Sequence, residues 1–309
     1  MSLEINKVGI IGTGLIGAGW AAFYASKGFA VNLYDAAPSG GQFGFDKTLE
    51  YLSFLQDQSV LDPAQYEKAV NGVRIAKDLP DAVFGVQLIQ ESGPENYEIK
   101  KKIFHEIDEH TGADVIVLSS SSGLLITELQ KVMALPERSL IAHPFNPPHL
   151  IPLVELVPGE KTDKQLLSEV KEFFASLGKI PVILKKEIPG HIANRLQAAV
   201  WREAINMVLA DVASVEDIDK ALFAGPGLRW ALMGQHLTFQ LGGGEVWHFI
   251  IQDYVDTVQR VAPDKLDSLG IASTSRAYPP STGSIITPEP TMLALLLSGG
   301  MATLICRRK

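Results

Sequence analysis

The sequence has very little cysteine, since Cys306 is the only one in 309 residues. A lone cysteine excludes an internal disulfide framework and a cysteine-rich zinc site, so we expect no metal and a reducing, cytoplasmic location. Positive charge is also scarce: Lys and Arg total 27 against 35 Asp and Glu, for a net charge of -8. Without a block of basic residues to neutralise phosphates, nucleic acid is not an expected partner.

An export signal is also missing from the start of the chain, because no cationic segment and no cleavage site accompany the first apolar run. Hydrophobic residues make up 46% of the chain and charged residues 20%, which is typical of a globular protein rather than a disordered one. The length allows one large domain, or two of moderate size that each bury a core.

Short apolar runs alternate with helical patterns in the first half of the chain. The expected strands are residues 7–11, 29–34, 86–90, 115–118, 140–142, 153–157 and 181–184. The expected helices are residues 15–27, 95–109, 191–210, 215–223 and 245–260. Continuous apolar strands in βαβ order predict a parallel sheet with both faces covered, and the change to helices alone predicts a second domain.

We therefore expect an α/β protein with a Rossmann-type doubly wound sheet over residues 1–187 and a smaller all-α domain over 188–270. Residues 271–309 are expected to form a linker and an apolar tail. The apolar run 291–306 is shorter than the ~20 residues that span a bilayer, so a membrane association is not expected. A sorting signal, a packed helix and an accidental extension stay open as explanations of the tail.

The segment Gly12-Thr13-Gly14-Leu15-Ile16-Gly17 has the pattern G-x-G-x-x-G between an expected strand and an expected helix. Such a turn presents backbone N–H groups to a pyrophosphate, and an acid about 20 residues further on binds the adenosine ribose. Asp35 holds that place, and no basic residue follows it closely, which favours NAD over NADP. The alternative is a glycine turn that binds no nucleotide. The residues predicted to bind the cofactor here are Gly12, Gly14, Leu15, Ile16, Gly17 and Asp35.

His143 and Glu155 are candidates for proton transfer. His143 ends one expected strand, and Glu155 lies in the middle of the next, in the apolar run Leu-Val-Glu-Leu-Val. A buried carboxylate needs a partner, and an imidazole paired with it keeps its other nitrogen free as a base. The alternative is that Glu155 points outward at a sheet edge and His143 is a loop residue.

Two further polar positions are less specific. The serine run 119–122 follows a strand at the end where ligands collect in open α/β sheets, although the serines could equally cap the next helix. Asn194 lies inside an expected helix, where asparagine has no conformational advantage. This position indicates a function, although solvent exposure would also explain it.

These motifs, in this order, resemble the 3-hydroxyacyl-CoA dehydrogenase family over roughly residues 5 to 260. The segments that carry the resemblance include Glu91-Ser-Gly-Pro-Glu95, His143-Pro-Phe-Asn-Pro and Pro189-Gly-x-x-x-Asn194-Arg. The resemblance implies that His143 is the catalytic base, Glu155 its orienting acid, and Ser122 and Asn194 contacts to the substrate. It also implies that Glu95, Lys100 and Ser120 lie beside a bound NAD.

The helical half resembles the L-carnitine 3-dehydrogenase branch of that family, on the segment from Gly225 to Gly234 and on Trp201-Arg202-Glu203. The implied reaction is oxidation of the 3-hydroxyl of a small 3-hydroxy acid, L-carnitine, to 3-dehydrocarnitine. The trimethylammonium group would face an aromatic ring, and an arginine would bind the carboxylate. The candidates are Trp201, Trp230 and Phe239 for the cation, and Arg202 and Arg229 for the carboxylate.

Several alternatives stay open. The substrate could be L-gulonate or a short 3-hydroxyacyl-CoA such as 3-hydroxybutyryl-CoA, and a chain of this kind could also serve as a structural protein that binds NAD without turnover. The tryptophans could instead form the core of a helical dimer domain. An apolar all-α second domain makes a homodimer the expected assembly.

Overall fold

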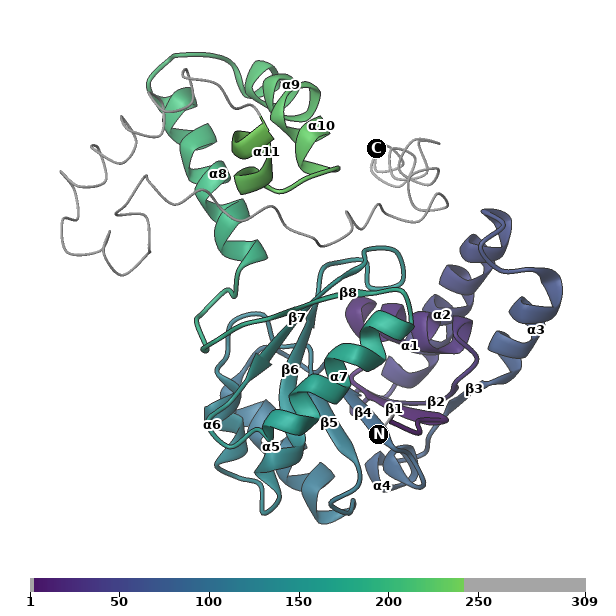
Figure 1. The fold of residues 1–309 in the computed structure, drawn as a ribbon. Coiled ribbons are helices and arrows are strands. Elements are labelled where there is room, and N and C mark those ends of the chain that lie inside the picture. The colour runs from purple at the N-terminus through teal and green to yellow at the C-terminus, as the bar shows by residue number, and fades with distance from the viewer. Residues whose placement is uncertain (1–2, 242–309) are drawn as a thin grey trace. The chain divides into compact units, whose positions relative to one another are not determined.

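The structure, a computed structural model, describes residues 3–241 (Figure 1). The chain divides into two compact units after Val200, inside helix α8 (Ala193–Leu209). The domain limits expected from the sequence, at residues 187 and 270, stay predictions. The expected helix 245–260, the linker and the apolar tail lie outside the described residues.

The strands form one sheet, and every strand expected from the sequence is present. They are β1 (Lys7–Ile11), β2 (Ala30–Tyr34), β3 (Val73–Ile75), β4 (Leu88–Glu91), β5 (Ile116–Ser119), β6 (Ser139–Pro144), β7 (Leu153–Pro158) and β8 (Ile180–Ile183). The spatial order is β3-β2-β1-β4-β5-β6-β7-β8. All neighbours are parallel except β6 and β7, which are antiparallel. The direction of winding reverses between β1 and β4, which is where doubly wound sheets bind ligands.

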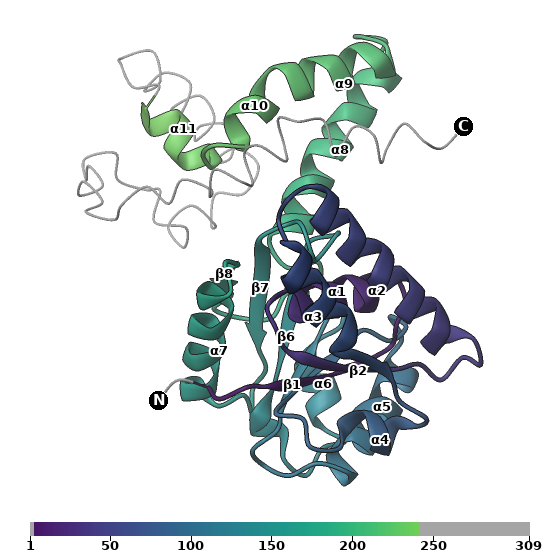
Figure 2. The same cartoon turned by 90° about the vertical axis from the view of Figure 1, so that its right-hand side faces the viewer.

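The helices cover both faces of this sheet (Figure 2). The helices on the sheet are α1 (Leu15–Ser26), α2 (Gly40–Asp57), α3 (Pro63–Asn71), α4 (Leu79–Val83), α5 (Tyr97–Glu109), α6 (Ile126–Gln130) and α7 (Lys164–Ser176), with a 3-10 turn at Pro136–Arg138. After α8 the chain continues with α9 (Val215–Ala224), α10 (Pro226–Trp230) and α11 (Gln235–Leu241) of the second unit. Across residues 3–241, no helix is both long and apolar enough to span a membrane.

Two separate cores follow from the alternation of side chains along the strands. Val8 and Ile10 pack on one face with residues of α1, α2, α3 and α7, whereas Ile11 packs on the other with residues of α4, α5 and α6. Leu88 and Ile89 of β4 are divided between the faces in the same way. Burial on both faces explains why these strands are apolar throughout, and the doubly wound α/β fold is confirmed.

Several elements differ from expectation. The helix expected from residue 95 begins at Tyr97, because the Asn96 side chain accepts a hydrogen bond from the Ile99 N–H at 3.1 Å and caps the first turn. Between residues 40 and 83, the helices α2, α3 and α4 and the strand β3 are not among the elements expected from the sequence, and neither is α7. Ser214 does cap α9 as expected, since its Oγ accepts the Asp217 N–H at 3.1 Å.

A buried lysine lies in the core on the α1 side of the sheet. Lys179, which precedes β8, donates from its Nζ to the carbonyl oxygens of Pro148 and, at 2.8 Å, Ile151. The ammonium also lies 4.3 Å from the centre of the Phe23 ring. Burial, and then the like charge of Lys27, lower the pKa of Lys179 to about 7.

We expect this lysine to make stability depend on pH. An unfolded lysine titrates near 10.4, so between pH 7 and 9 the unfolded chain binds a proton that the folded chain has released. The free energy of unfolding should therefore rise over this range relative to that of Lys179→Met, by up to about 1.4 kcal/mol per pH unit. Urea unfolding of both proteins at pH 6, 7.5 and 9 measures the difference.

The comparison isolates Lys179 although His149 is its neighbour. Burial, and then Lys179, lower the pKa of folded His149 to about 4, so it stays neutral in the folded state over this range. The titration of His149 in the unfolded chain is common to both proteins and cancels. A difference between the two proteins that stays constant from pH 6 to 9 would contradict the prediction.

Candidate functional site

The glycine-rich turn after β1 is closely packed at its first and third glycines. Gly12 has φ +88°, and a Cβ there would lie 2.6 Å from backbone atoms of the segment after β4. A Cβ at Gly17 would lie 1.9 Å from the Gly12 carbonyl oxygen. At Gly14, by contrast, a Cβ would meet no atom within 4 Å, and no side chain caps the start of α1. This open helix N-terminus fits the pyrophosphate of a dinucleotide.

Asp35 lies directly beside this turn, at the end of β2. Its Oδ2 accepts a hydrogen bond from the Thr13 N–H at 2.8 Å, and its Oδ1 accepts one from the Ala37 N–H at 2.9 Å. The carboxylate is thereby held in place, and its remaining lone pairs can accept hydrogen bonds from ribose hydroxyls. The next basic residue in the sequence is Lys47, so no nearby cation in the loop offers a partner for a 2′-phosphate.

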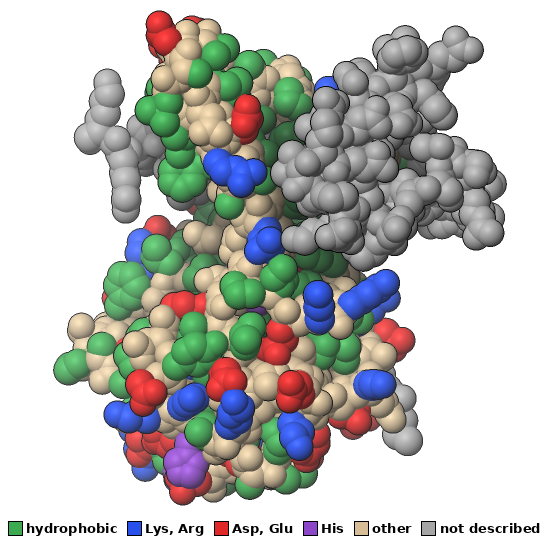
Figure 3. All heavy atoms as spheres, turned by 90° about the vertical axis from the view of Figure 1, so that its left-hand side faces the viewer, with side chains coloured by type: hydrophobic (Ala, Val, Ile, Leu, Met, Phe, Trp, Pro, Cys, Tyr) green, Lys and Arg blue, Asp and Glu red, His purple; other side chains and the backbone are tan. Residues whose placement is uncertain are grey.

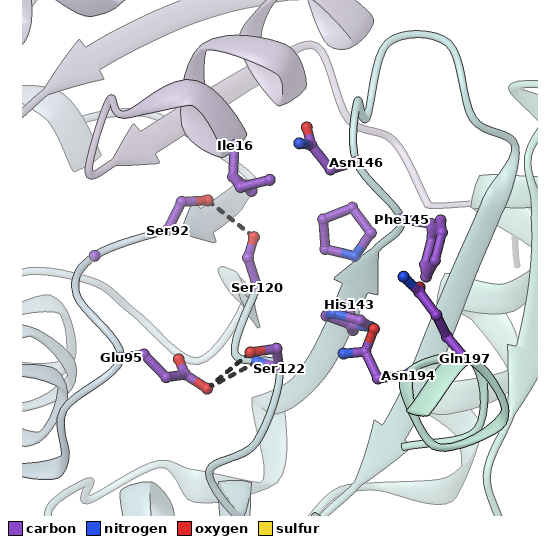
Figure 4. Close-up of a pocket in the computed structure, with 12 residues that line it drawn as sticks. Ile16, Ser92, Glu95, Ser120, Ser122, His143, Phe145, Asn146, Asn194 and Gln197 are labelled. Atoms are coloured by element: carbon purple, nitrogen blue, oxygen red, sulfur yellow. Dashed lines mark hydrogen bonds between the residues drawn. The ribbon is translucent and has the colours of Figure 1, made fainter. Parts of the chain in front are cut away.

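A cavity of about 500 Å³ opens at the same end of the sheet (Figure 4). It is lined by Ile16, Ser92, Gly93, Glu95, Ser120, Ser122, His143, Pro144, Phe145, Asn146, Asn194 and Gln197. These residues come from the start of α1, from the segments that follow β4, β5 and β6, and from the first turns of α8. The cavity therefore lies at the carboxyl ends of the strands, next to the point where the winding reverses.

The two residues expected to transfer a proton are hydrogen-bonded to each other. His143 on β6 and Glu155 on β7 are directly opposite in the antiparallel ladder, and Nδ1 of His143 lies 2.9 Å from Oε2 of Glu155. Glu155 is 1% exposed, so it does not point outward at a sheet edge. Since an ionised carboxylate only accepts, Nδ1 donates, and Nε2 of the neutral imidazole keeps its lone pair.

The other oxygen of Glu155 is bound to the start of α8. Its Oε1 accepts hydrogen bonds from the backbone N–H groups of Ile192, at 2.8 Å, and Ala193, at 3.0 Å. Burial raises the pKa of the Glu155 carboxyl, but the hydrogen bonds from His143 and these two N–H groups outweigh burial and lower it overall. The carboxylate is thus ionised at neutral pH and can stabilise an imidazolium on His143.

The Glu95 carboxylate organises the serine segment. Its Oε1 accepts hydrogen bonds from the Ser121 hydroxyl at 2.8 Å and from the backbone N–H groups of Ser122, at 2.9 Å, and Gly123, at 2.8 Å. Burial raises its pKa, but these hydrogen bonds and the charge of Lys100 lower it overall. The loop after β5 therefore wraps an ionised carboxylate in the cavity wall.

The Lys100 side chain does not line the cavity. It is 1% exposed, and its Nζ lies 2.7 and 2.9 Å from the two carboxylate oxygens of Glu91 and 3.1 Å from the Gly93 carbonyl oxygen. Glu91 in turn accepts a hydrogen bond from the Ser119 hydroxyl at 2.6 Å. Lys100 therefore acts on the cavity from behind its wall, through the segment that Glu91 holds and through its ion pair with Glu95, whose Oε2 lies 3.8 Å from Nζ.

Some residues of this site were not singled out as candidates from the sequence. Glu91 is fully buried at the end of β4, and an acid two residues after the apolar pair Leu88-Ile89 was the available signal. Gln197 lines the cavity one helical turn after Asn194, a spacing that places both side chains on one face of α8. Ser120, expected beside the cofactor, lines the cavity and shares a hydrogen bond of 2.8 Å with the Ser92 hydroxyl.

The substrate candidates of the helical half lie in the second compact unit. Trp201 is 69% exposed and Trp230 is 39% exposed, so neither forms the core of the described part of this unit. Arg202 and Arg229 are exposed as well. The side chain of Phe239 lies outside the described residues. Figure 3 shows many hydrophobic side chains and few charged ones on the face of this unit that it presents, whereas acidic and basic side chains alternate over the α/β unit.

Comparison with known families agrees with this geometry. Residues 7–188 match the model of the 3-hydroxyacyl-CoA dehydrogenase NAD binding domain, and residues 190–268 match that of the C-terminal domain of the same family. Together the two matches cover the residues that line the cavity and the described part of the helical unit.

The similar proteins include L-carnitine dehydrogenases and a 3-hydroxyacyl-CoA dehydrogenase. An L-carnitine dehydrogenase of Streptomyces griseus is 39% identical over 242 residues, which cover 78% of this chain and 71% of the relative. A 3-hydroxyacyl-CoA dehydrogenase of Gibberella moniliformis is 40% identical over 248 residues, which cover 79% of this chain and 74% of the relative.

Solved structures show the same architecture. A 5-formyl-3-hydroxy-2-methylpyridine 4-carboxylic acid 5-dehydrogenase, an NAD+ dependent dismutase, superposes with a TM-score of 0.75 at 31% identity, over 99% of this chain and 98% of that one. The (S)-3-hydroxybutyryl-CoA dehydrogenase of Ralstonia eutropha superposes with a TM-score of 0.67 at 30% identity, over 72% and 78% of the two chains. The chain belongs to the 3-hydroxyacyl-CoA dehydrogenase family and is an NAD-dependent oxidoreductase that acts on CH–OH groups.

Proposed function

We propose that the protein oxidises the 3-hydroxyl of L-carnitine to 3-dehydrocarnitine. The observation that carries the chemistry is the buried His143–Glu155 pair, 2.9 Å apart, at a cavity that Ser122 and Asn194 also line. The relationship to L-carnitine dehydrogenases, at 39% identity for the Streptomyces griseus protein, supports the choice of substrate. An acyl-CoA ester is the second candidate, because the Gibberella relative bears the name 3-hydroxyacyl-CoA dehydrogenase.

In this proposal each residue of the site has a defined role in the reaction. Bound NAD+ supplies the hydride acceptor. Nε2 of His143 takes the proton of the 3-hydroxyl, and the Glu155 carboxylate stabilises the imidazolium that results. Ser122 and Asn194 donate hydrogen bonds to the reacting oxygen and orient the substrate. Glycines 12, 14 and 17, with Leu15 and Ile16, hold the pyrophosphate, while Asp35 binds the ribose.

The proposal extends to assembly and location. A homodimer is supported by the exposed apolar side chains of the helical unit, among them Leu209, Phe223 and Leu228, which are 80%, 64% and 64% exposed. A cytoplasmic location is supported by the single cysteine.

The first experiment tests the His143–Glu155 pair. Each of the variants His143→Ala and Glu155→Gln should lower kcat by ~10²–10⁴, because the base or its ionised partner is lost. The double variant should be little worse than His143→Ala alone, since the two side chains act as one unit. The readout is NADH absorbance under saturating cofactor, with thermal midpoints as the control for folding. Losses that multiply in the double variant would mean that the residues act independently.

The second experiment tests the choice of cofactor. Asp35→Asn keeps the size of the side chain and removes its charge, whereas Asp35→Ala also removes the acceptors of two backbone N–H groups. Both variants should lower the ratio of kcat/KM with NAD to kcat/KM with NADP, because a 2′-phosphate is no longer repelled. If only Asp35→Ala changes the ratio, the carboxylate acts through the fold of the turn. If neither does, the assignment of Asp35 is wrong.

The third experiment tests the substrate. We expect turnover of L-carnitine to exceed that of L-gulonate and 3-hydroxybutyryl-CoA in one NADH absorbance assay. Trp230→Leu should then raise KM for carnitine by roughly 2- to 30-fold, the equivalent of about 0.5–2 kcal/mol of cation–π attraction. KM for an uncharged 3-hydroxy acid serves as the reference, and Trp201→Leu tests the other candidate tryptophan in the same way. An equal rise for both substrates would assign Trp230 a structural role.

A further inference from the structure

His191 has a backbone conformation that is rare for a residue with a side chain. Its φ is +49°, in the left-handed region, and its side chain is 2% exposed. Residues other than glycine rarely adopt this conformation, and they keep it where the surrounding structure holds them. The residue lies between Gly190 and the first turn of α8, so the conformation turns the chain into the helix that carries Asn194.

The His191 imidazole is neutral with a defined tautomer. Its Nε2 lies 3.0 Å from the carbonyl oxygen of Ser121, and because a carbonyl only accepts, Nε2 carries the proton. Its Nδ1 is buried without a hydrogen-bond partner, so the second N–H of a charged ring would have no acceptor. Burial lowers the pKa of His191, and a charge on His143 lowers it further, while the Ser121 carbonyl, Glu155 and Glu95 act in the opposite direction.

Three parts of the site converge on this residue. Its ring centre lies 5.0 Å from that of His143. Its hydrogen bond ends on the carbonyl of Ser121, the residue before Ser122. The two residues after it, Ile192 and Ala193, donate their backbone N–H groups to Glu155. The side chain of His191 therefore joins the serine segment to the start of α8, whose backbone holds Glu155.

We propose that His191 is a positioning residue, which fixes the serine segment and the start of α8 around the His143–Glu155 pair through its hydrogen bond to Ser121. A neutral ring suits this place, because a second cation 5.0 Å from His143 would oppose protonation of the base during the reaction. The inference rests on the proposed roles of His143, Ser122 and Asn194.

A pair of variants tests the hydrogen bond. His191→Phe keeps a planar ring and loses the donor to Ser121, whereas the side-chain amide of His191→Gln offers an N–H in place of Nε2. We expect His191→Phe to lower kcat about tenfold, the size of effect that follows when a buried acceptor loses its hydrogen bond. KM for NAD should stay unchanged, because the glycine turn and Asp35 are untouched. His191→Gln should recover kcat to within about threefold of the wild type.

The opposite results would overturn the inference. These are an unchanged kcat in His191→Phe, an equal loss of kcat in both variants, or a fall in thermal midpoint with normal kinetics. In the same assay, His143→Ala separates the two hypotheses: if it retains activity, the proposed function fails, and if it is inactive while His191→Phe is fully active, only the role of His191 fails.

A measurement on the unmodified protein covers the case in which His191→Phe does not fold. In the NAD-loaded full-length chain labelled with ¹⁵N-histidine, the His191 resonances, assigned by their loss in His191→Gln, should show a protonated Nε2 and an unprotonated Nδ1 at pH 7. An unprotonated Nε2 would contradict the hydrogen bond to Ser121, and a ring that is charged at pH 7 would contradict the neutral imidazole on which the inference depends.

Discussion

The carboxylate of Glu155 lies between two strands with 1% of its surface exposed, and a buried charge of this kind costs several kcal/mol unless its oxygens are hydrogen-bonded. The structure meets that requirement with three donors from two directions. Oε2 binds the imidazole of His143, and Oε1 binds two backbone N–H groups at the start of α8. Satisfying this one charge therefore fixes the tautomer of His143 and the position of the helix that carries Asn194.

The same principle recurs in the neighbouring segments. Glu91 is ionically paired with Lys100 and holds the chain after β4, and Glu95 binds the loop after β5 through Ser121 and its neighbours. Each carboxylate accepts hydrogen bonds from protein donors. It thereby orders a segment that has no regular secondary structure of its own. A cavity ordered in this way needs little rearrangement when the substrate binds, which is the condition for electrostatic stabilisation of a transition state.

The sequence predicted the doubly wound sheet, because strands buried on both faces are apolar throughout and the glycine pattern identifies the first turn. It left the orientation of Glu155 open, since only the antiparallel register of β6 and β7 turns that side chain toward His143. The burial of Lys100 and the role of Glu91 could not be read from spacing, because their pairing depends on how α5 packs against β4. The elements between residues 40 and 83 were missed because no apolar run there matches those of the central strands.

Because β7 runs antiparallel to β6, the geometry of the His143–Glu155 pair and the shape of the cavity depend on different parts of the chain. In the antiparallel ladder, Glu155 faces His143 from the middle of a strand that is paired on its other side with Val182 of β8. The separation of Glu155 and His143 is thus set by the spacing between paired strands, ~4.5–5.5 Å from Cβ to Cβ. The segments that line the cavity leave from the strand ends instead. Exchanging those segments for others, in evolution or by engineering, can reshape the cavity while the His143–Glu155 pair is inherited intact.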